Sequence, residues 1–279
     1  MLHFRFLRFA GLLLGLAVLL GSAVPGPVVQ TRDFSSYFAA HGLRGSLLVL
    51  NGATGQYTAY DEARCRQGFL PASTFKIPNT LIGLETGAVR DTAEVFRWDG
   101  KKRSFPQWNQ DMSLAQALRV SCVPCYQQIA RRVGAKRYQQ WLPKLRFGRM
   151  QVTPATVDSF WLVGSSRITQ FEQIDFLQRL QQGKLPISKR NQDLTKTLLE
   201  LSRGPGWVLR GKTGWAMREG QDNGWFVGWV EQTGQVYFFA LNVEPADGQP
   251  ATSSFGPGRR ALTEDILRQE FGLLAGPGK

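Results

Sequence analysis

Residues 71–79 read Pro-Ala-Ser-Thr-Phe-Lys-Ile-Pro-Asn, and they place Ser73 and Lys76 three positions apart at the start of an apolar segment. The segment predicts a helix on which Lys76 returns to the face that carries Ser73. Ser73 would lie among free backbone N–H groups at the positive end of that helix. A serine attacks well only when a neighbour takes its proton, and a lysine does so only if burial or modification gives it a usable pKa. The apolar flanks argue against the plainer interpretation, a capping serine and a solvated lysine.

A second segment, Lys212-Thr-Gly214, lies on a predicted strand between Gly211 and Trp215. Glycine lets a ligand approach the strand backbone, while the lysine and the threonine offer a charge and a hydroxyl for a carboxylate. Alone this triplet means little. The order S-x-x-K, polar loop, K-T-G is far more specific.

Strand patterns and helix patterns are segregated along the chain. Strand patterns occupy its two ends, as a hairpin of 45–51 with 56–61 and as three runs at 207–214, 224–231 and 235–243. Helical patterns occupy the middle and close the chain, at 114–121, 124–134, 169–183, 193–201 and about 259–271.

This order predicts an α/β (α+β) fold in which both chain ends build one antiparallel sheet, flanked by helices, with a mostly helical subdomain inserted. We expect a single catalytic domain over residues 24–279. Its sheet subdomain comes from 24–87 and 201–279, and its helical subdomain from roughly 88–200. A cleft between the two subdomains is a common place for a ligand.

Residues 1–23 have the pattern of a secretory signal peptide. Arg5 and Arg8 precede the apolar run 11–20, and small residues follow it, which predicts cleavage after Ala23. The apolar run is short for a membrane span of about 20 residues. We therefore expect export to the periplasm, with no stable membrane insertion after cleavage.

The chain carries a formal net charge of +13 but contains two histidines, His3 and His41. The basic residues form short clusters, such as 101–103, so we interpret them as a solvated surface and expect no nucleic-acid partner. The Cys and His residues lack the number and spacing of a zinc site, so no metal is expected. A Ser-His-Asp triad would have to use His41 alone. The general base must therefore be sought elsewhere, which points to a lysine.

Three cysteines remain, Cys65, Cys122 and Cys125. The sequence Cys122-Val-Pro-Cys125 has the spacing of a redox motif, and export permits oxidation. However, no strand leads into this helix near the start of the chain, as that motif usually requires. We therefore expect three buried thiols and no disulfide.

Together these segments resemble the penicillin-recognising serine enzymes and, within them, the class D (oxacillin-hydrolysing) β-lactamases. The resemblance covers essentially the whole mature chain and implies the β-lactamase/transpeptidase-like fold. The matching segments are 71–87 for the nucleophile, Ser121-Cys-Val123 for the S-x-V element, Phe160-Trp-Leu-Val-Gly164 for the active-site tryptophan, Lys212-Thr-Gly-Trp215 for the last motif and Arg259 for a carboxylate-binding arginine.

The resemblance implies hydrolysis of the β-lactam amide of penicillin-type antibiotics, and with it antibiotic resistance. Ser73 would form the acyl-enzyme. Lys76, carrying a carbamate (N6-carboxylysine) made from carbon dioxide or bicarbonate, would be the base for acylation and deacylation. Val123 would keep this pocket dry, Trp161 would donate a hydrogen bond to the carbamate, and Ser121 would relay a proton to the lactam nitrogen.

The same resemblance implies the substrate contacts. The backbone N–H groups of Ser73 and Trp215 would form the oxyanion hole. The substrate-binding residues would be Lys212, Thr213, Gly214, Trp215 and Arg259. No organic cofactor is implied. The partners are small β-lactam molecules, and the protein is expected to be a monomer or a homodimer.

Several alternatives stay open at the level of sequence. Arg260 stands beside Arg259 and competes for its role, and Trp161 fits an ordinary core position as well. Phe147-Gly-Arg149 replaces the usual Tyr-Gly-Asn of the class, which puts the substrate range and the rim contacts in doubt. A penicillin sensor that stays acylated and a peptidoglycan carboxypeptidase or transpeptidase are alternative functions, although the S-x-V element argues against the second.

Overall fold

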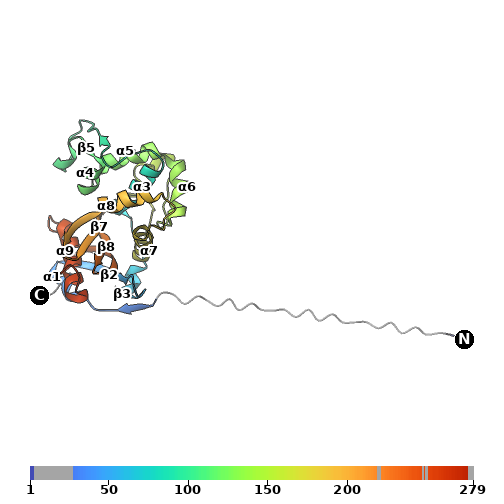
Figure 1. Ribbon diagram of the computed structural model, residues 1–279, viewed down its shortest axis with the longest axis vertical. Coiled ribbons are helices and arrows are strands. Elements are labelled where there is room, and N and C mark those ends of the chain that lie inside the picture. The colour runs from blue at the N-terminus through green and yellow to red at the C-terminus, as the bar shows by residue number, and fades with distance from the viewer. Residues whose placement is uncertain (3–27, 219–220, 247, 249–250, 276–279) are drawn as a thin grey trace.

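The computed structural model describes residues 1–2, 28–218, 221–246, 248 and 251–275. Within them, one seven-stranded sheet has the order β1-β3-β2-β9-β8-β7-β6, and a lobe of helices stands above it in Figure 1. β1 pairs parallel with β3, and the other neighbours in this sheet pair antiparallel. The strands are β1 (Val29–Thr31), β2 (Leu43–Asn51), β3 (Tyr57–Tyr60), β6 (Glu200–Gly204), β7 (Trp207–Arg218), β8 (Gln221–Gln232) and β9 (Gln235–Pro245).

The centre of the sheet joins the two ends of the chain. β2 pairs with β9 along its whole length, from Leu43 opposite Pro245 to Asn51 opposite Tyr237. Side chains alternate along a strand, so Leu47 faces one apolar core and Leu48 faces the other. A strand buried on both faces appears in the sequence as a continuous apolar run. The predicted sheet built from both chain ends is confirmed.

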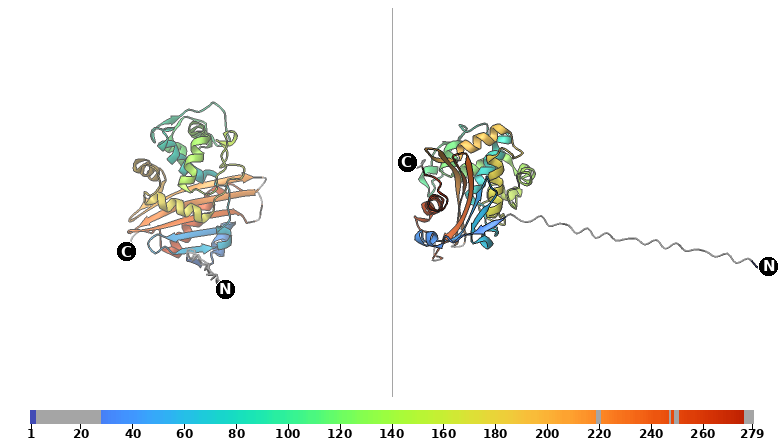
Figure 2. Two further views of the ribbon diagram at one scale, coloured as in Figure 1. Left: turned by 90° about the vertical axis from the view of Figure 1, so that its right-hand side faces the viewer. Right: turned by 60° about the horizontal axis from the view of Figure 1, so that its bottom comes forward.

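Helices cover both faces of this sheet (Figure 2). α1 (Ser35–Ala40) and α9 (Phe255–Phe271) pack on the face of Leu47, and α7 (Gln170–Gln181) packs on the opposite face. The predicted helical insertion is also present. It contains α4 (Leu114–Arg119), α5 (Val123–Val133), α6 (Ala135–Leu145), α8 (Lys189–Leu198) and a small sheet of β4 (Val95–Phe96) with β5 (Met112–Ser113), and it packs against α3 (Lys76–Glu85).

Some predicted boundaries are wrong. The helix expected over 193–201 ends at Leu198, and Glu200 opens β6, which pairs with β7. The backbone groups of β6 pair with β7, which follows after a two-residue turn, so this segment extends the sheet instead of the helix. α9 begins at Phe255 rather than near Arg259. Ser73 lies in the 3-10 turn η1 (Ala72–Phe75), so it precedes α3 instead of opening it.

The predicted signal peptide falls on residues 1–23, of which 3–23 lie outside the described residues. Within the described part of the chain, no helix is both long and apolar enough to cross a membrane. The predicted cleavage after Ala23 therefore stays a prediction.

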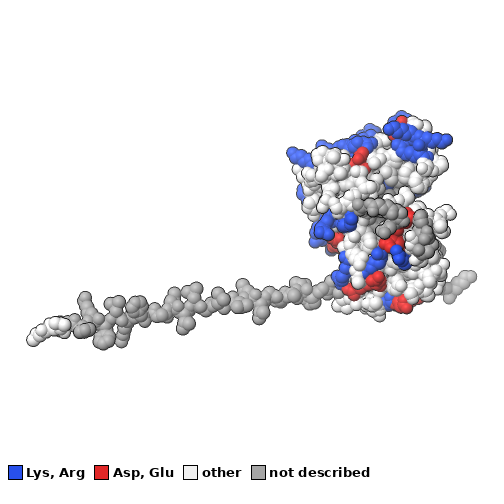
Figure 3. Space-filling view, turned by 180° about the vertical axis from the view of Figure 1, so that it is seen from behind, with Lys and Arg blue, Asp and Glu red and all other residues white. Residues whose placement is uncertain are grey.

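The excess of positive charge is concentrated in the helical lobe. Residues 88–200 hold 19 of the lysines and arginines but nine of the acidic residues. Figure 3 shows basic side chains prevailing on this lobe and a mixture of both signs on the sheet half. The basic character of the sequence is therefore a property of one subdomain rather than of the whole surface.

Candidate active site

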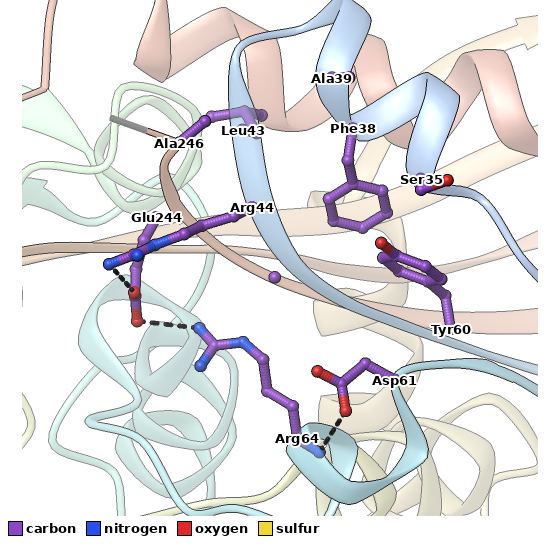
Figure 4. Close-up of a pocket in the computed structure, with 11 residues that line it drawn as sticks. Ser35, Phe38, Ala39, Leu43, Arg44, Tyr60, Asp61, Arg64, Glu244 and Ala246 are labelled. Carbon is purple, nitrogen blue, oxygen red and sulfur yellow. Dashed lines mark hydrogen bonds and ion pairs between the residues drawn. The ribbon is translucent and has the colours of Figure 1, made fainter. Parts of the chain in front are cut away.

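Two cavities of similar size differ in their chemistry. The cavity in Figure 4 has a volume of about 500 Å³ and lies among α1, α2 (Glu62–Cys65) and β2. Its arginines are paired, because Arg44 and Arg64 lie 3.3 and 2.9 Å from the carboxylate of Glu244. Asp61 accepts a hydrogen bond from the backbone N–H of Arg64. The charged groups of this cavity therefore largely satisfy one another.

The second cavity, of about 520 Å³, collects most of the residues predicted for the site. It lies between η1, the start of α5, β7 and α9. Its polar side is lined by Ser73, Ser121, Thr213 and Arg259, and its apolar rim by Phe105, Trp108, Val120, Val123, Leu162, Val163 and Met217. The rim residues outside the motifs were missed in the sequence, because they come from separate segments that meet only in the folded chain.

Ser73 and Lys76 are in direct contact beneath this cavity. Lys76 Nζ donates to Ser73 Oγ at 2.6 Å. Ser73 is 8 % exposed and Lys76 is 0 % exposed. Burial, and then the charge of Lys212, hold the pKa of Lys76 well below that of an ordinary lysine. A neutral amine beside a hydroxyl can accept its proton, so the pair can activate a nucleophile.

Lys212 and Ser121 form a second amine–hydroxyl pair. Lys212 Nζ donates to Ser121 Oγ at 3.0 Å and to the backbone oxygen of Thr213 at 2.9 Å. Burial and the charge of Arg259 lower the pKa of Lys212 to about 7. Lys212 can therefore both hold and release a proton near neutral pH, and Ser121 is placed to carry it.

The strand β7 turns an unpaired edge toward η1. Gly211 N–H bonds to Leu199 O on the β6 side, at 2.9 Å. Because a strand repeats every two residues, Trp215 N–H points to that same edge, where β6 no longer pairs in the described structure. A Cβ on Gly214 would lie 3.2 Å from Pro71 O. This close approach brings the Trp215 N–H group beside the turn that carries Ser73.

Arg259, and not Arg260, reaches the cavity. Its guanidinium donates to the backbone oxygens of Gly214 and Gly256 and lies over the ring of Trp215. A Cβ on Gly224 would lie 2.4 Å from Arg259 Cδ, so glycine is required there. Arg260 points elsewhere and bonds to Glu264 and Ser202. The cavity therefore offers one arginine to an anionic group.

Trp161 is buried beside η1, the turn that carries Ser73. Its backbone oxygen accepts from Ala72 N–H at 2.9 Å, and its ring stacks on Phe75 with centroids 5.3 Å apart. Its indole N–H is buried and has no hydrogen-bond partner among the described residues. A buried donor without an acceptor is rare in proteins, so this group is available to an additional acceptor.

The start of α5 covers the lysine. Val123 lines the cavity, and the Tyr126 ring centroid lies 5.4 Å from Lys76 Nζ. Tyr126 also shares a hydrogen bond with Thr80 on α3, at 2.7 Å. Tyr126 was missed in the sequence, where it looks like an ordinary apolar helix position. The sequence pattern that could have identified Tyr126 is its position three residues after Val123, which places both residues on the same helical face.

The expectation of three free thiols is wrong. Cys122 and Cys125 form a disulfide, whereas Cys65 is a buried thiol. The helical turn at the start of α5 brings the two cysteine Cα atoms to 5.5 Å, within the usual range for a bridge. The missing strand, which argued against a redox motif, does not affect this local geometry.

Phe147, Gly148 and Arg149, which stand where the class usually has Tyr-Gly-Asn, do not line the cavity. Phe147 is fully buried and packs against Phe75 and Phe176. Gly148 adopts φ +58°, and its approach to Arg167 O leaves no room for a Cβ. The turn is therefore kept, and the Phe147 ring packs beneath η1, the turn that carries Ser73.

The described residues contain no group of three or more His, Cys, Asp or Glu side chains placed to hold a metal ion.

Comparison with known proteins agrees with this geometry. The penicillin binding protein transpeptidase domain family matches residues 45–267. The chain is 37 % identical over 264 residues to β-lactamase OXA-10 of Pseudomonas aeruginosa, covering 94 % of this chain and 97 % of that protein. The chain belongs to the class D β-lactamases. Its similarity to β-lactamase OXA-48 of Klebsiella pneumoniae is 38 % identity over 241 residues, with 86 % and 89 % of the two chains covered.

Solved structures give the same family. A class D β-lactamase from Nostoc superposes with a TM-score of 0.82 at 40 % identity, over 87 % of this chain and 99 % of that one. A class D β-lactamase from Sebaldella termitidis superposes with a TM-score of 0.82 at 30 % identity, over 90 % and 100 %. The penicillin-recognising fold expected from the motifs is thus confirmed.

The buried lysines predict how stability depends on pH. The folded-state pKa values of Lys76 and Lys212 lie below the 10.5 of a solvated lysine. Between about pH 7 and pH 10 these two lysines therefore bind more protons in the unfolded chain, so their contribution to the free energy of unfolding rises with pH. We expect a smaller rise in Lys76→Met, measured by urea unfolding at several pH values in buffer free of carbon dioxide. The exposed Lys184→Met is the control, and an unchanged slope in Lys76→Met would contradict a neutral amine.

Proposed function

We propose that this class D β-lactamase hydrolyses the amide bond of penicillin-type β-lactams through an acyl-enzyme on Ser73, and that it thereby confers antibiotic resistance. The observation that carries this proposal is the 2.6 Å contact between Ser73 Oγ and the fully buried amine of Lys76. A hydroxyl beside an amine that stays neutral is what nucleophilic attack at neutral pH requires. Family membership supports the same reaction.

Acylation begins when Ser73 Oγ attacks the lactam carbonyl carbon and gives its proton to the base at Lys76. The new C–O bond forms, the lactam C–N bond breaks, and the nitrogen leaves with a proton. Ser121 delivers that proton, and Lys212, 3.0 Å away, replaces it. The base then loses the Ser73 proton to solvent, and Lys212 regains a proton from solvent. A water molecule attacks the ester carbonyl and gives its proton to the freed base, the ester C–O bond breaks, and the base returns this proton to Ser73 Oγ.

The base at Lys76 is proposed to be a carbamate made from carbon dioxide or bicarbonate. Carbamylation requires a neutral amine, and the lowered pKa of Lys76 supports it. The unpartnered indole N–H of Trp161 is a suitable donor for a carbamate oxygen. When present, this group supplies an oxygen base in an otherwise apolar pocket. Val123 and Tyr126 exclude water from the amine, and no organic cofactor is required.

The developing oxyanion is proposed to lie between the backbone N–H groups of Ser73 and Trp215. The unpaired edge of β7 beside η1 supports this role. One such donor is typically worth about 3 kcal/mol in the transition state. The substrate carboxylate is proposed to bind Lys212, Thr213 and Arg259, since these side chains carry the charge and the hydroxyl that a carboxylate prefers. Gly214 keeps the strand open to the ligand.

Export completes the proposal. We propose that residues 1–23 are removed during transport to the periplasm and that residues 24–279 are one catalytic domain. The mature protein then acts as a monomer or a homodimer on small β-lactam molecules, with no nucleic-acid partner.

The turnover of a chromogenic cephalosporin and of benzylpenicillin, with and without bicarbonate, tests the reaction. We expect turnover that bicarbonate increases, a loss of about 10³-fold or more in Ser73→Ala, and loss of covalent penicillin labelling in the same variant. Lys76→Ala should at least fail to deacylate, and thermal melts confirm that each variant is folded. One acylation per molecule without turnover would instead indicate a penicillin sensor.

The two adjacent arginines give a matched test of carboxylate binding. Arg259→Ala removes a charge-assisted contact, typically about 1.5–3 kcal/mol, so KM for benzylpenicillin should rise about tenfold or more. Arg260→Ala is the control and should leave KM within about twofold. A penicillin ester, which lacks the negative charge, should not distinguish Arg259→Ala from the wild type. Equal effects of both substitutions would refute the assignment.

The signal peptide is tested by the mass of the exported protein. Expressed from the full chain in a bacterium with a periplasm, the protein should be recovered there beginning at Val24. Ala23→Arg should prevent cleavage at this bond, because the cleavage site needs small residues. Recovery of the uncleaved wild-type chain in the membrane fraction would overturn the assignment.

A further inference from the structure

We propose that the Cys122–Cys125 disulfide is a positioning element of the active site, which holds the first turn of α5 closed over Lys76 and so keeps water from its amine. The proposal rests on the proposed function, because it concerns the base at Lys76. Cys122 and Cys125 act through their neighbours rather than on Ser73 itself.

The bridge encloses the turn that the catalytic motif occupies. Cys122 is the middle residue of Ser121-Cys-Val123, and the bridge closes over Val123 and Pro124. Cys122 N–H bonds to Ala117 O at 2.8 Å, which ties the turn to the end of α4. The segment is thereby held at both of its ends.

This turn needs such a restraint. Ser121 adopts φ +56°, a left-handed conformation that is unfavourable for a residue with a side chain. Strained backbone of this kind persists only where the surrounding structure enforces it. The conformation is nevertheless the one in which Ser121 Oγ meets Lys212 Nζ at 3.0 Å. A covalent link one residue later restrains the backbone at the point of strain.

The same turn carries the side chains that cover Lys76. Val123 lines the cavity, and Tyr126, the residue after Cys125, places its ring centroid 5.4 Å from Lys76 Nζ. Asn79, on the helix of Lys76, donates to Tyr126 O at 3.3 Å. If the turn loosens, Val123 and Tyr126 move together, and water reaches the amine. Protonation then competes with carbamylation.

The bridge is a fixed staple and not an exchanging redox centre. Cys122 is 0 % exposed and Cys125 is 5 % exposed, whereas thiol–disulfide exchange needs a thiolate to reach a sulfur. Breaking the bridge takes two electrons and two protons from a reductant such as a dithiol, which is itself oxidised to a disulfide. A bridge across so short a loop also removes little entropy from the unfolded chain. Local restraint therefore accounts for it better than global stability.

The test measures the carbamate directly, by the ¹³C NMR signal of protein titrated with ¹³C-bicarbonate at pH 7. The protein variants are the wild type, Cys122→Ala/Cys125→Ala and Cys65→Ala, whose thiol is equally buried but unbridged. If water reaching the amine brings the pKa of Lys76 to about one unit above the pH of the experiment, about one amine in ten stays neutral. The double variant should therefore need about tenfold more bicarbonate for half of the maximal signal, and Cys65→Ala should match the wild type.

Measuring kcat distinguishes a loss of positioning at the site from unfolding of the variant. Saturating bicarbonate should restore most of the kcat of the double variant, which misfolding would not allow. Wild-type protein that is unfolded, reduced with dithiothreitol and refolded in its presence, so that both thiols stay free, should show the same shift without any substitution. Overlapping bicarbonate curves for bridged and unbridged protein would overturn the proposal. A wild type that hydrolyses penicillin but gives no carbamate signal would instead overturn the carbamylated base, and a wild type without turnover would overturn the proposed function itself.

Discussion

The rest of the structure depends on one energetically unfavourable feature. The amine of Lys76 is buried beside the hydroxyl of Ser73, and no carboxylate among the described residues pairs with it. Water would protonate this amine, and the low-dielectric interior opposes that charge. α3 supplies Lys76, and η1 supplies Ser73, 2.6 Å away. Tyr126 and Val123 close the space above them. Burying a polar group lowers the stability of the folded protein. The buried contact between Lys76 and Ser73 therefore makes the interior less stable than an apolar pair would.

The sheet provides the fixed side of this arrangement and the helical lobe provides the other. β7 is held by β8 along its full length, so its unpaired edge beyond Gly211 lies rigidly against η1. Two glycines make the contact possible, because Gly214 admits the Pro71 backbone and Gly224 admits Arg259. Residues that are distant in the chain thus meet at distances set by backbone packing. The same packing fixes the positions of the side chains that line the cavity.

Two of the six described non-glycine residues with positive φ lie at the same place. Ala72, directly before Ser73, has φ +48°, and Ser121 has φ +56°. Each is held by neighbours: Ala72 N–H bonds to Trp161 O, and Ser121 precedes the bridged turn. Strain of this kind is characteristic of functional sites.

The sequence by itself determined the family, the β2–β3 hairpin, the strands β7 to β9 and helix α7, whose Thr169–Glu172 capping box is present. These features depend on contacts within a few residues, which local patterns record. Tertiary structure alone brought Arg259, rather than Arg260, to the cavity and placed the Trp161 indole beside Phe75. It also joined Cys122 to Cys125, although the pair is local, because a buried turn had to hold the two side chains together. Each of these outcomes depends on partners distant in the chain or on burial, and neither can be read from the spacing of residues.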